Sequence, residues 1–316
     1  RDRARPSGEA SDRGAFEPER GGRVIVHVAT MPGRINYMLD NSADSRRILY
    51  ELHENLIQPD WETWEYRGVL AERWTVEDAL VLRGGRGPDG GNVVYGELAK
   101  TTDGWRVTPR SPRPGTGGGE SGEPRLVPYD DVERVERGTV FTFHVRPGVR
   151  WHDGHVLDGR DVLFSYSCYR NPDVQCGAKR YQFDQITRAE LVDPMTVRFF
   201  FDRQYFLTLS TFENLTVLPA HRFDLSDPEN PDHRPGQAVS DAAQARYVNE
   251  HPGNRDWIGL GPYRMTAWTP QYIEAERFDG YFDPARGGWL DTIRWRHVGN
   301  PDVALQALLE GELDFL

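Results

Sequence analysis

The segment Trp151-His152-Asp153-Gly154-His155 combines two imidazoles, three residues apart, with a carboxylate between them. These side-chain types bind zinc or nickel, so the pattern first suggests a metal site. A structural zinc site normally has four protein ligands and a catalytic one has three, and we find no further set of spaced ligands. A tight turn, in which the aspartate accepts bonds from nearby backbone amides, explains the same residues. We therefore favour the turn and predict no metal or other cofactor.

Other patterns with chemical potential are incomplete. Residues 259–263 (GLGPY) begin like a phosphate-binding loop, but Pro262 lacks an N–H donor and no third glycine follows at the required spacing. No Gly-x-Ser-x-Gly nucleophile elbow occurs. Cys168 and Cys176, eight residues apart, allow either a small loop disulfide in an oxidising compartment or two reduced, partly buried thiols. The sequence thus predicts binding without catalysis.

Aromatic residues give a more positive indication. The chain has nine tryptophans, and Trp61, Trp64 and Trp74 lie near Tyr50 and Tyr66. Each tryptophan taken alone is more often part of a core, but together they suit a cleft for an amphipathic small ligand. The net charge of −11 argues against a general nucleic-acid partner, which requires a basic surface. Small-ligand binding is therefore the leading class of function.

Alternating and helical patterns predict a mixed α/β (α+β) chain of short elements. Ser42 or Asp44 caps a helix that carries Ile48, Leu49, Leu52 and Leu56, and Asp158 with Asp161 forms a capping box. Asn300, Pro301 and Gly311 bracket a final helix, and a further short one is expected at 241–249. The predicted strands are residues 23–28, 139–145, 195–201, 273–277 and 292–298.

Two polar segments are predicted to lack regular structure. Residues 1–22 indicate a disordered leader, and a Gly/Pro/Arg-rich insert begins at residue 83. Its low-complexity part, residues 109–124 (PRSPRPGTGGGESGEP), is too polar to bury a core of its own. No apolar run approaches the ~18 residues that cross a bilayer.

Several motifs in the same order resemble the extracellular solute-binding proteins of family 5, the peptide, oligopeptide and nickel-binding components of ABC importers. The resemblance covers residues 24–316 apart from the insert. The motifs that carry it are 50–56 (YELHENL), 70–74 (LAERW), 142–154 (TFHVRPGVRWHDG), 158–165 (DGRDVLFS), 192–199 (VDPMTVRF), 218–221 (LPAH), 259–263 (GLGPY) with Trp268, and 304–314 (ALQALLEGELD).

The resemblance implies a periplasmic-binding-protein-like type II clamshell. We expect residues 23–316 to form its N-terminal lobe, with the second lobe largely missing because the chain ends near the family's crossing point. Within this lobe we expect a smaller subdomain at about 45–190, including a flexible insert at 83–138. The main subdomain is then formed by 23–44 and 191–316 and is incomplete.

The implied function is capture of peptides or a similar small solute and its delivery to an ABC permease. In the peptide-binding branch, the first lobe presents main-chain groups after its first strand to an extended ligand. Here that position belongs to Met31, Pro32, Gly33, Arg34, Ile35 and Asn36.

A metal or metal-chelate carrier of the same fold, using His152, His155 or His297, is the alternative. We expect a periplasmic or extracellular location. The protein is either free or attached to the membrane surface by a lipid anchor that precedes Arg1.

Overall fold

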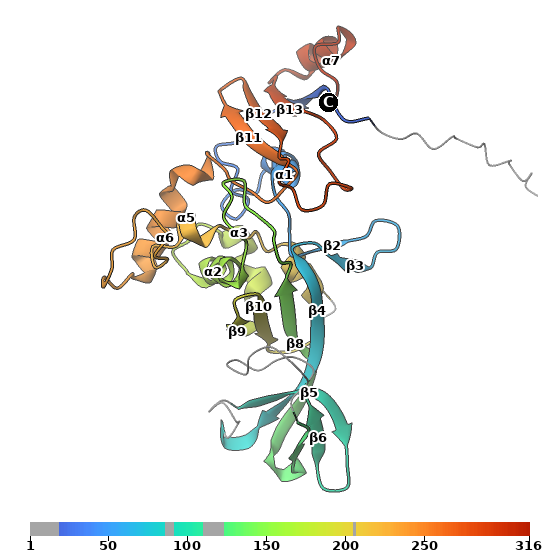
Figure 1. Ribbon diagram of the computed structural model, residues 1–316, viewed down its shortest axis with the longest axis vertical. Coiled ribbons are helices and arrows are strands. Elements are labelled where there is room, and N and C mark those ends of the chain that lie inside the picture. The colour runs from blue at the N-terminus through green and yellow to red at the C-terminus, as the bar shows by residue number, and fades with distance from the viewer. Residues whose placement is uncertain (1–18, 86–91, 110–122, 205–206) are drawn as a thin grey trace, which may run out of the picture.

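The computed structural model describes residues 19–85, 92–109, 123–204 and 207–316. A four-stranded and a seven-stranded sheet follow one another along its long axis, with helices between and beside them, and two short strands form a separate hairpin (Figure 1). In the described part of the chain, no helix is long and apolar enough to span a membrane. The strands are β1 (Arg23–Val28), β2 (Ile57–Pro59), β3 (Tyr66–Gly68), β4 (Ala71–Leu82), β5 (Val93–Lys100), β6 (Trp105–Thr108), β7 (Arg125–Val127), β8 (Val132–Val145), β9 (Ile186–Asp193), β10 (Thr196–Phe201), β11 (Tyr263–Trp268), β12 (Tyr272–Arg277) and β13 (Thr292–His297). The helices are α1 (Ala43–Leu52), α2 (Gly159–Arg170), α3 (Gly177–Arg180), α4 (Thr208–Glu213), α5 (Ala220–Phe223), α6 (Asp241–Glu250) and α7 (Pro301–Leu309).

The four-stranded sheet has the order β1-β13-β12-β11, so strands from the two ends of the chain lie side by side. β1 pairs in parallel with β13, and the remaining neighbours are antiparallel. The other edge of β1 meets the last residues of the chain, because His27 donates its backbone N–H to the carbonyl oxygen of Phe315 at 2.9 Å. Val28, Ile273 and Trp295 bury their side chains under this sheet.

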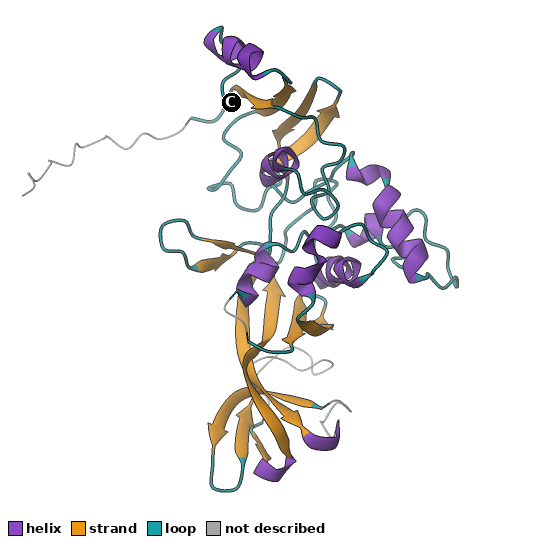
Figure 2. Cartoon of the chain, turned by 180° about the vertical axis from the view of Figure 1, so that it is seen from behind, coloured by secondary structure: helices purple, strands orange, loops and turns teal. Residues whose placement is uncertain are grey.

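The seven-stranded sheet has the order β7-β6-β5-β4-β8-β10-β9, and the long strands β4 and β8 run through its whole height (Figure 2). Phe141, Phe143, Phe199 and Phe212 pack ring against ring on one face of it and form the centre of the core. The sheet continues to Phe201, beyond the subdomain boundary expected near residue 190, because β9 and β10 form a hairpin along its edge.

The insert contains more regular structure than the sequence indicates. Its described parts form β5, β6, β7 and the first half of β8, where a flexible segment at 83–138 was expected. These strands are ordered because they enclose a second apolar core, whose buried members include Leu80, Val94, Trp105, Val107 and Val127. Residues 110–122, which make up most of the low-complexity sequence, lie outside the described residues.

Local signals in the sequence identify the starts of α1 and α2 correctly. Ser42 caps α1 through a bond from the N–H of Ser45, and Asp158 with Asp161 forms the predicted capping box of α2. Cys168 and Cys176 are both free and buried. Residues 1–18 of the expected leader lie outside the described residues, whereas Gly21 and Gly22 bind Trp289 and Asp291.

Candidate functional site

The predicted ligand segment, residues 31–36, connects β1 to α1, and its second half is anchored in the core. The side chains of Ile35 and Asn36 are fully buried. The N–H of Ile35 donates to the carbonyl oxygen of Asn254 at 2.8 Å, and the Asn36 side-chain amide donates to the Asn254 Oδ1 at 2.8 Å. Pro32 is also buried. These three residues fix the shape of the segment.

The first half of the segment keeps open main-chain groups. Within the described residues, neither the N–H nor the C=O of Met31 or Gly33 forms a hydrogen bond. The residues on either side of 31–33 are hydrogen-bonded to the start of α1. The Thr30 N–H donates to the Asp44 carboxylate, and the Arg34 carbonyl oxygen accepts from the Ser45 hydroxyl at 3.1 Å. A fixed stretch of chain with unused peptide groups is what an extended ligand needs for strand addition.

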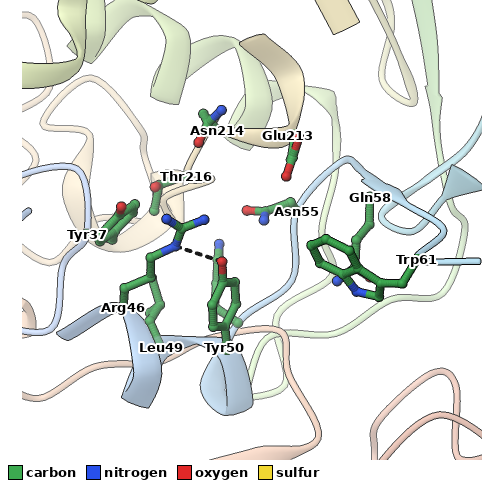
Figure 3. A pocket seen from close by; sticks show the side chains of 11 residues that line it. Tyr37, Arg46, Leu49, Tyr50, Asn55, Gln58, Trp61, Glu213, Asn214 and Thr216 are labelled. Atoms are coloured by element: carbon green, nitrogen blue, oxygen red, sulfur yellow. Dashed lines mark hydrogen bonds between the residues drawn. The ribbon is translucent and has the colours of Figure 1, made fainter. Parts of the chain in front are cut away.

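A small pocket of about 50 Å³ begins one residue beyond this segment, at Tyr37 (Figure 3). Drug-sized ligands normally occupy roughly 300–1,000 Å³, so a larger solute would fill this pocket with one group only. Side chains of α1, of the β2 region and of the segment after α4 form its walls. They are Tyr37, Arg46, Leu49, Tyr50, His53, Asn55, Gln58, Trp61, Glu213, Asn214 and Thr216.

Opposite charges face this pocket from two elements. Arg46 on α1 donates from Nε to the Tyr50 hydroxyl at 2.7 Å, which leaves its other guanidinium N–H groups directed into the pocket (Figure 3). Glu213, at the end of α4, accepts a hydrogen bond from the Tyr66 hydroxyl at 3.1 Å. Burial and the Glu213 carboxylate raise the pKa of Tyr66 to about 12, so its hydroxyl stays a donor. The pocket therefore offers both a cation and an anion to a ligand.

His53 lies at the buried end of the pocket, and neither of its ring nitrogens has a hydrogen-bond partner among the described residues. Its ring stacks on Trp151 and meets Trp257 edge to face. Burial, together with the neighbouring His152, lowers the pKa of His53 to about 3. The imidazole is therefore neutral at physiological pH and contributes an apolar, aromatic end wall.

The tryptophan cluster expected from the sequence is divided in the structure. Trp61 lines the pocket with 66% of its surface exposed, and Trp64, 72% exposed, meets it edge to face at 5.8 Å. Trp74 instead stacks against Phe143 at the edge of the core. Two exposed neighbouring indoles beside a polar pocket form an apolar surface that a ligand or a further part of the protein can cover.

The three histidines considered for metal binding have different surroundings. His152 is buried between two backbone groups: its Nδ1 accepts from the Gly259 N–H at 3.0 Å and its Nε2 lies 3.0 Å from the Gly261 carbonyl oxygen. His297 is exposed at the end of β13. Among the described residues, His155 lies beside Asp153 and His221 instead. His152, His155 and His297 therefore do not form one ligand set.

Several pocket residues were missed by sequence reasoning. Arg46, Gln58, Glu213 and Thr216 belong to no recognisable motif, Asn55 lies in the 50–56 motif but had no assigned role, and chain folding alone brings α4 to α1. The usable signals in the sequence were the aromatic residues around Tyr50 and Trp61 and the 50–56 motif.

Comparisons with known proteins agree with this fold. Residues 65–316 match the model of the bacterial extracellular solute-binding proteins, family 5. The glutathione-binding protein GsiB of Pectobacterium atrosepticum is 30% identical over 191 residues, which are 59% of this chain and 32% of GsiB. The chain thus spans about a third of that relative's length.

Solved structures support the same assignment of fold. One is the oligopeptide-binding protein AppA of Bacillus subtilis in complex with a nonapeptide. The matched region covers 94% of this chain and 44% of the AppA chain, with a TM-score of 0.60 and 20% sequence identity. Another is NikZ of Campylobacter jejuni in complex with Ni(L-His). The matched region covers 92% of this chain and 42% of the NikZ chain, with a TM-score of 0.57 and 18% sequence identity. The mixed α/β solute-binding-protein fold predicted from the sequence is confirmed. Because the family model matches well over half of its residues, the chain belongs to the bacterial extracellular solute-binding proteins of family 5.

Proposed function

We propose that the full-length protein captures a peptide or a similar small solute outside the cytoplasmic membrane and delivers it to the permease of an ABC importer, without chemistry on the solute. Two relatives bind ligands of this class: GsiB is a glutathione-binding protein, and the AppA structure contains a nonapeptide. The chain corresponds to less than half of either protein, so the proposal concerns the full-length molecule.

One observation carries the proposal: open peptide groups at Met31 and Gly33 lie one short segment away from a pocket that presents Arg46 and Glu213. An extended peptide bonds to open main-chain groups through its own backbone. A nearby pocket of about 50 Å³ accepts one side chain or terminus of such a ligand. Charged groups of both signs suit a zwitterionic solute better than a purely apolar one.

Closure of two lobes completes the proposed mechanism. A ligand shifts a clamshell protein towards its closed state only through contacts that the closed state strengthens. The exposed indoles of Trp61 and Trp64 and the open pocket supply one half of those contacts. We therefore expect residues 1–316 alone to bind the solute weakly. The extracellular site of action follows from the family, and a lipid anchor upstream of Arg1 remains part of the proposal.

A metal-chelate cargo is less well supported. NikZ shows that this fold can hold Ni(L-His) in another protein. In this chain, however, ligation by His152 would break two hydrogen bonds to the 259–261 backbone, and His297 does not join His155 in any ligand set of the described residues.

Isothermal titration of the full-length protein tests the two cargoes together. We expect heat of binding with a pool of tri- to pentapeptides. Ni(L-His) is titrated into the His221→Ala variant, which lacks one member of the Asp153–His155–His221 cluster, and should give none. No heat with any peptide pool would sink the peptide assignment, and heat with Ni(L-His) alone would establish the alternative.

A further inference from the structure

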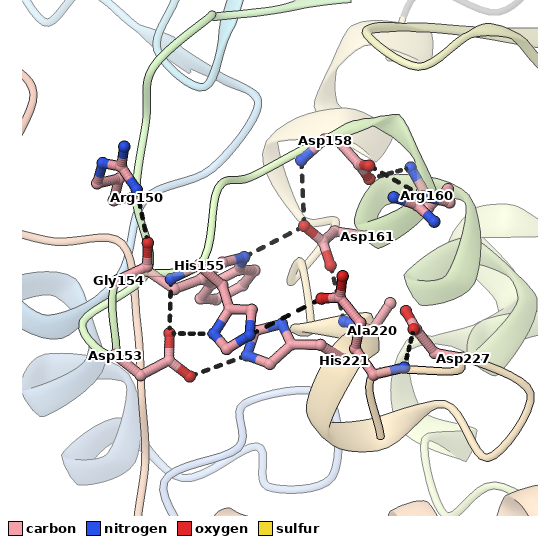
Figure 4. Close-up of polar contacts among 12 residues, drawn as sticks. Arg150, Asp153, Gly154, His155, Asp158, Arg160, Asp161, Ala220, His221 and Asp227 are labelled. Carbon is pink, nitrogen blue, oxygen red and sulfur yellow. Dashed lines mark hydrogen bonds and ion pairs between the residues drawn. The ribbon is translucent and has the colours of Figure 1, made fainter. Parts of the chain in front are cut away.

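A cluster of three metal-ligating side chains lies outside the pocket, on the turn that the sequence first singled out (Figure 4). The ligand atoms of Asp153, His155 and His221 all lie within 4.8 Å of one another. The His221 Nε2 is 2.8 Å from one Asp153 carboxylate oxygen, and the His155 Nδ1 is 3.3 Å from the other. Donors around a tetrahedral ion with bonds of ~2.1 Å are separated by about 3.4 Å, so the 3.3 Å spacing fits an ion, whereas the 2.8 Å spacing must widen when one binds.

The backbone that carries these side chains is well fixed. Trp151, two residues before Asp153, is fully buried and donates its indole N–H to Asp161 at 3.2 Å. The backbone N–H of Ala220, the residue before His221, donates to the same carboxylate at 2.7 Å. One buried aspartate therefore positions both the turn and the start of α5 (Figure 4). Preorganised supports of this kind reduce the cost of assembling a ligand set.

The surroundings favour a cation. Glu229 places a carboxylate oxygen 3.8 Å from the His155 Nε2, on the opposite side of the ring from Asp153. At this distance Glu229 contributes a neighbouring negative charge rather than a hydrogen bond to the His155 ring. The nearby cation Arg160 is paired with Asp158, so it does not occupy the cluster.

We propose that Asp153, His155 and His221 bind one divalent transition-metal ion of the zinc type, with water as the fourth ligand. Imidazole nitrogens and a carboxylate oxygen match the preference of zinc and disfavour magnesium, which selects oxygen ligands. The rings of His155 and His221 are stacked at 3.7 Å, and two parallel rings cannot both direct a lone pair at one ion. His155 must therefore rotate, which its 46% exposed side chain permits.

The bound ion links the 151–155 turn to α5. This staple is separate from the solute pocket, because the two sites share no residue, and it does not depend on the proposed function. An ion that binds only the folded state, and not the unfolded chain, stabilises the folded state by mass action. We expect saturating zinc to raise the unfolding temperature by about 3–6 °C.

The test uses the full-length protein purified without a histidine tag, stripped with a chelator and titrated calorimetrically with zinc. We expect one saturable site, and none with magnesium. His155→Ala is the central variant, because the contacts of its side chain with described residues are to Asp153 and His221 of the cluster and to Glu229 beside it. It should weaken zinc binding by more than about 100-fold, whereas Glu229→Gln, which removes only a neighbouring exposed charge, should weaken it by no more than about 5-fold.

His297→Ala is the matched control, because it removes an exposed histidine outside the cluster. It should leave both zinc affinity and the zinc-dependent rise in unfolding temperature unchanged. Circular dichroism of each stripped variant establishes that the fold is retained. The proposal is overturned by the absence of saturable zinc binding, by undiminished binding in His155→Ala, or by a loss confined to His297→Ala.

Discussion

The carboxylate of Asp161 accepts a hydrogen bond from the backbone N–H of Ala220 at 2.7 Å, which attaches the start of α5 to the first turn of α2. The same carboxylate accepts bonds from the Trp151 indole and from the Asp158 N–H, each at 3.2 Å. Burial raises the pKa of Asp161 to about 6, while these three donors favour the ionised form. One side chain thus joins a helix cap, a tight turn and a distant helix.

Replacing Asp161 by Asn should destabilise the protein by about 2 kcal/mol. The amide turns one acceptor oxygen into a donor, so at least one buried N–H loses its partner. Chemical denaturation at neutral pH measures the change in the free energy of unfolding. Asp158→Asn is the control, because an asparagine oxygen still caps α2, and its cost should stay below about 0.5 kcal/mol. Equal losses in the two variants would contradict the role assigned to Asp161.

The glycine-rich segment 259–263 packs against the end of α1 through Gly261. Its glycines therefore allow close backbone packing and do not form a phosphate-binding loop. The Gly261 N–H donates to the Leu52 carbonyl oxygen at 3.0 Å, and a Cβ at this position would lie 2.5–2.6 Å from backbone atoms of residues 51–53. Gly261→Ala must therefore displace the end of α1. We expect a loss of roughly 2–3 kcal/mol in the free energy of unfolding.

Gly177→Ala provides the comparison for that measurement. Nothing lies within 4 Å of a Cβ built on Gly177, so alanine should be neutral or slightly stabilising there. Because α1 carries Arg46 and Tyr50, Gly261→Ala should also weaken solute binding by the full-length protein, whereas Gly177→Ala should not. A Gly261→Ala protein as stable as the wild type would refute the packing argument.

Short-range patterns account for most of what the sequence predicted correctly. Ser42 caps α1 and Asn300 caps α7, each through bonds within three residues, and such signals are visible in a single sequence. The insert was misjudged because its order depends on contacts between strands rather than on composition: Trp105 and Val127 pair across β6 and β7. The same limit applies to the pocket, where Glu213 faces α1 only after the chain has folded.

The stability of the protein should fall as the pH is lowered below about 6.5, partly through His53. Burial lowers its pKa to about 3, whereas an unfolded histidine titrates near 6.5. Between these values the unfolded chain binds a proton that the folded protein does not, so stability decreases with decreasing pH. From pH 7 to pH 5 this single group accounts for about 2 kcal/mol.

His53→Phe isolates this contribution, because the ring contacts with Trp151 and Trp257 are retained while the titration is removed. Denaturation curves at pH 7 and pH 5 should show a loss that is about 2 kcal/mol smaller in the variant than in the wild type. His297→Ala, which removes an exposed imidazole, should keep the wild-type loss. An unchanged pH dependence in His53→Phe would show that this imidazole is not kept neutral by the fold.

Arg46 and its neighbour Arg47 allow a sharp test of the solute pocket. Arg46 is directed into the pocket beside Glu213, whereas Arg47 donates to the His27 carbonyl oxygen at 3.4 Å and lines no part of it. A hydrogen bond to a charged group is worth roughly 1.5–3 kcal/mol, so Arg46→Gln should weaken peptide binding by the full-length protein about 10- to 100-fold. Arg47→Gln makes the same change of charge one position along the helix and should leave the Kd of the peptide nearly unchanged. If both variants weaken binding equally in calorimetric titrations, the effect is a general one of charge, and the pocket is not where the solute binds.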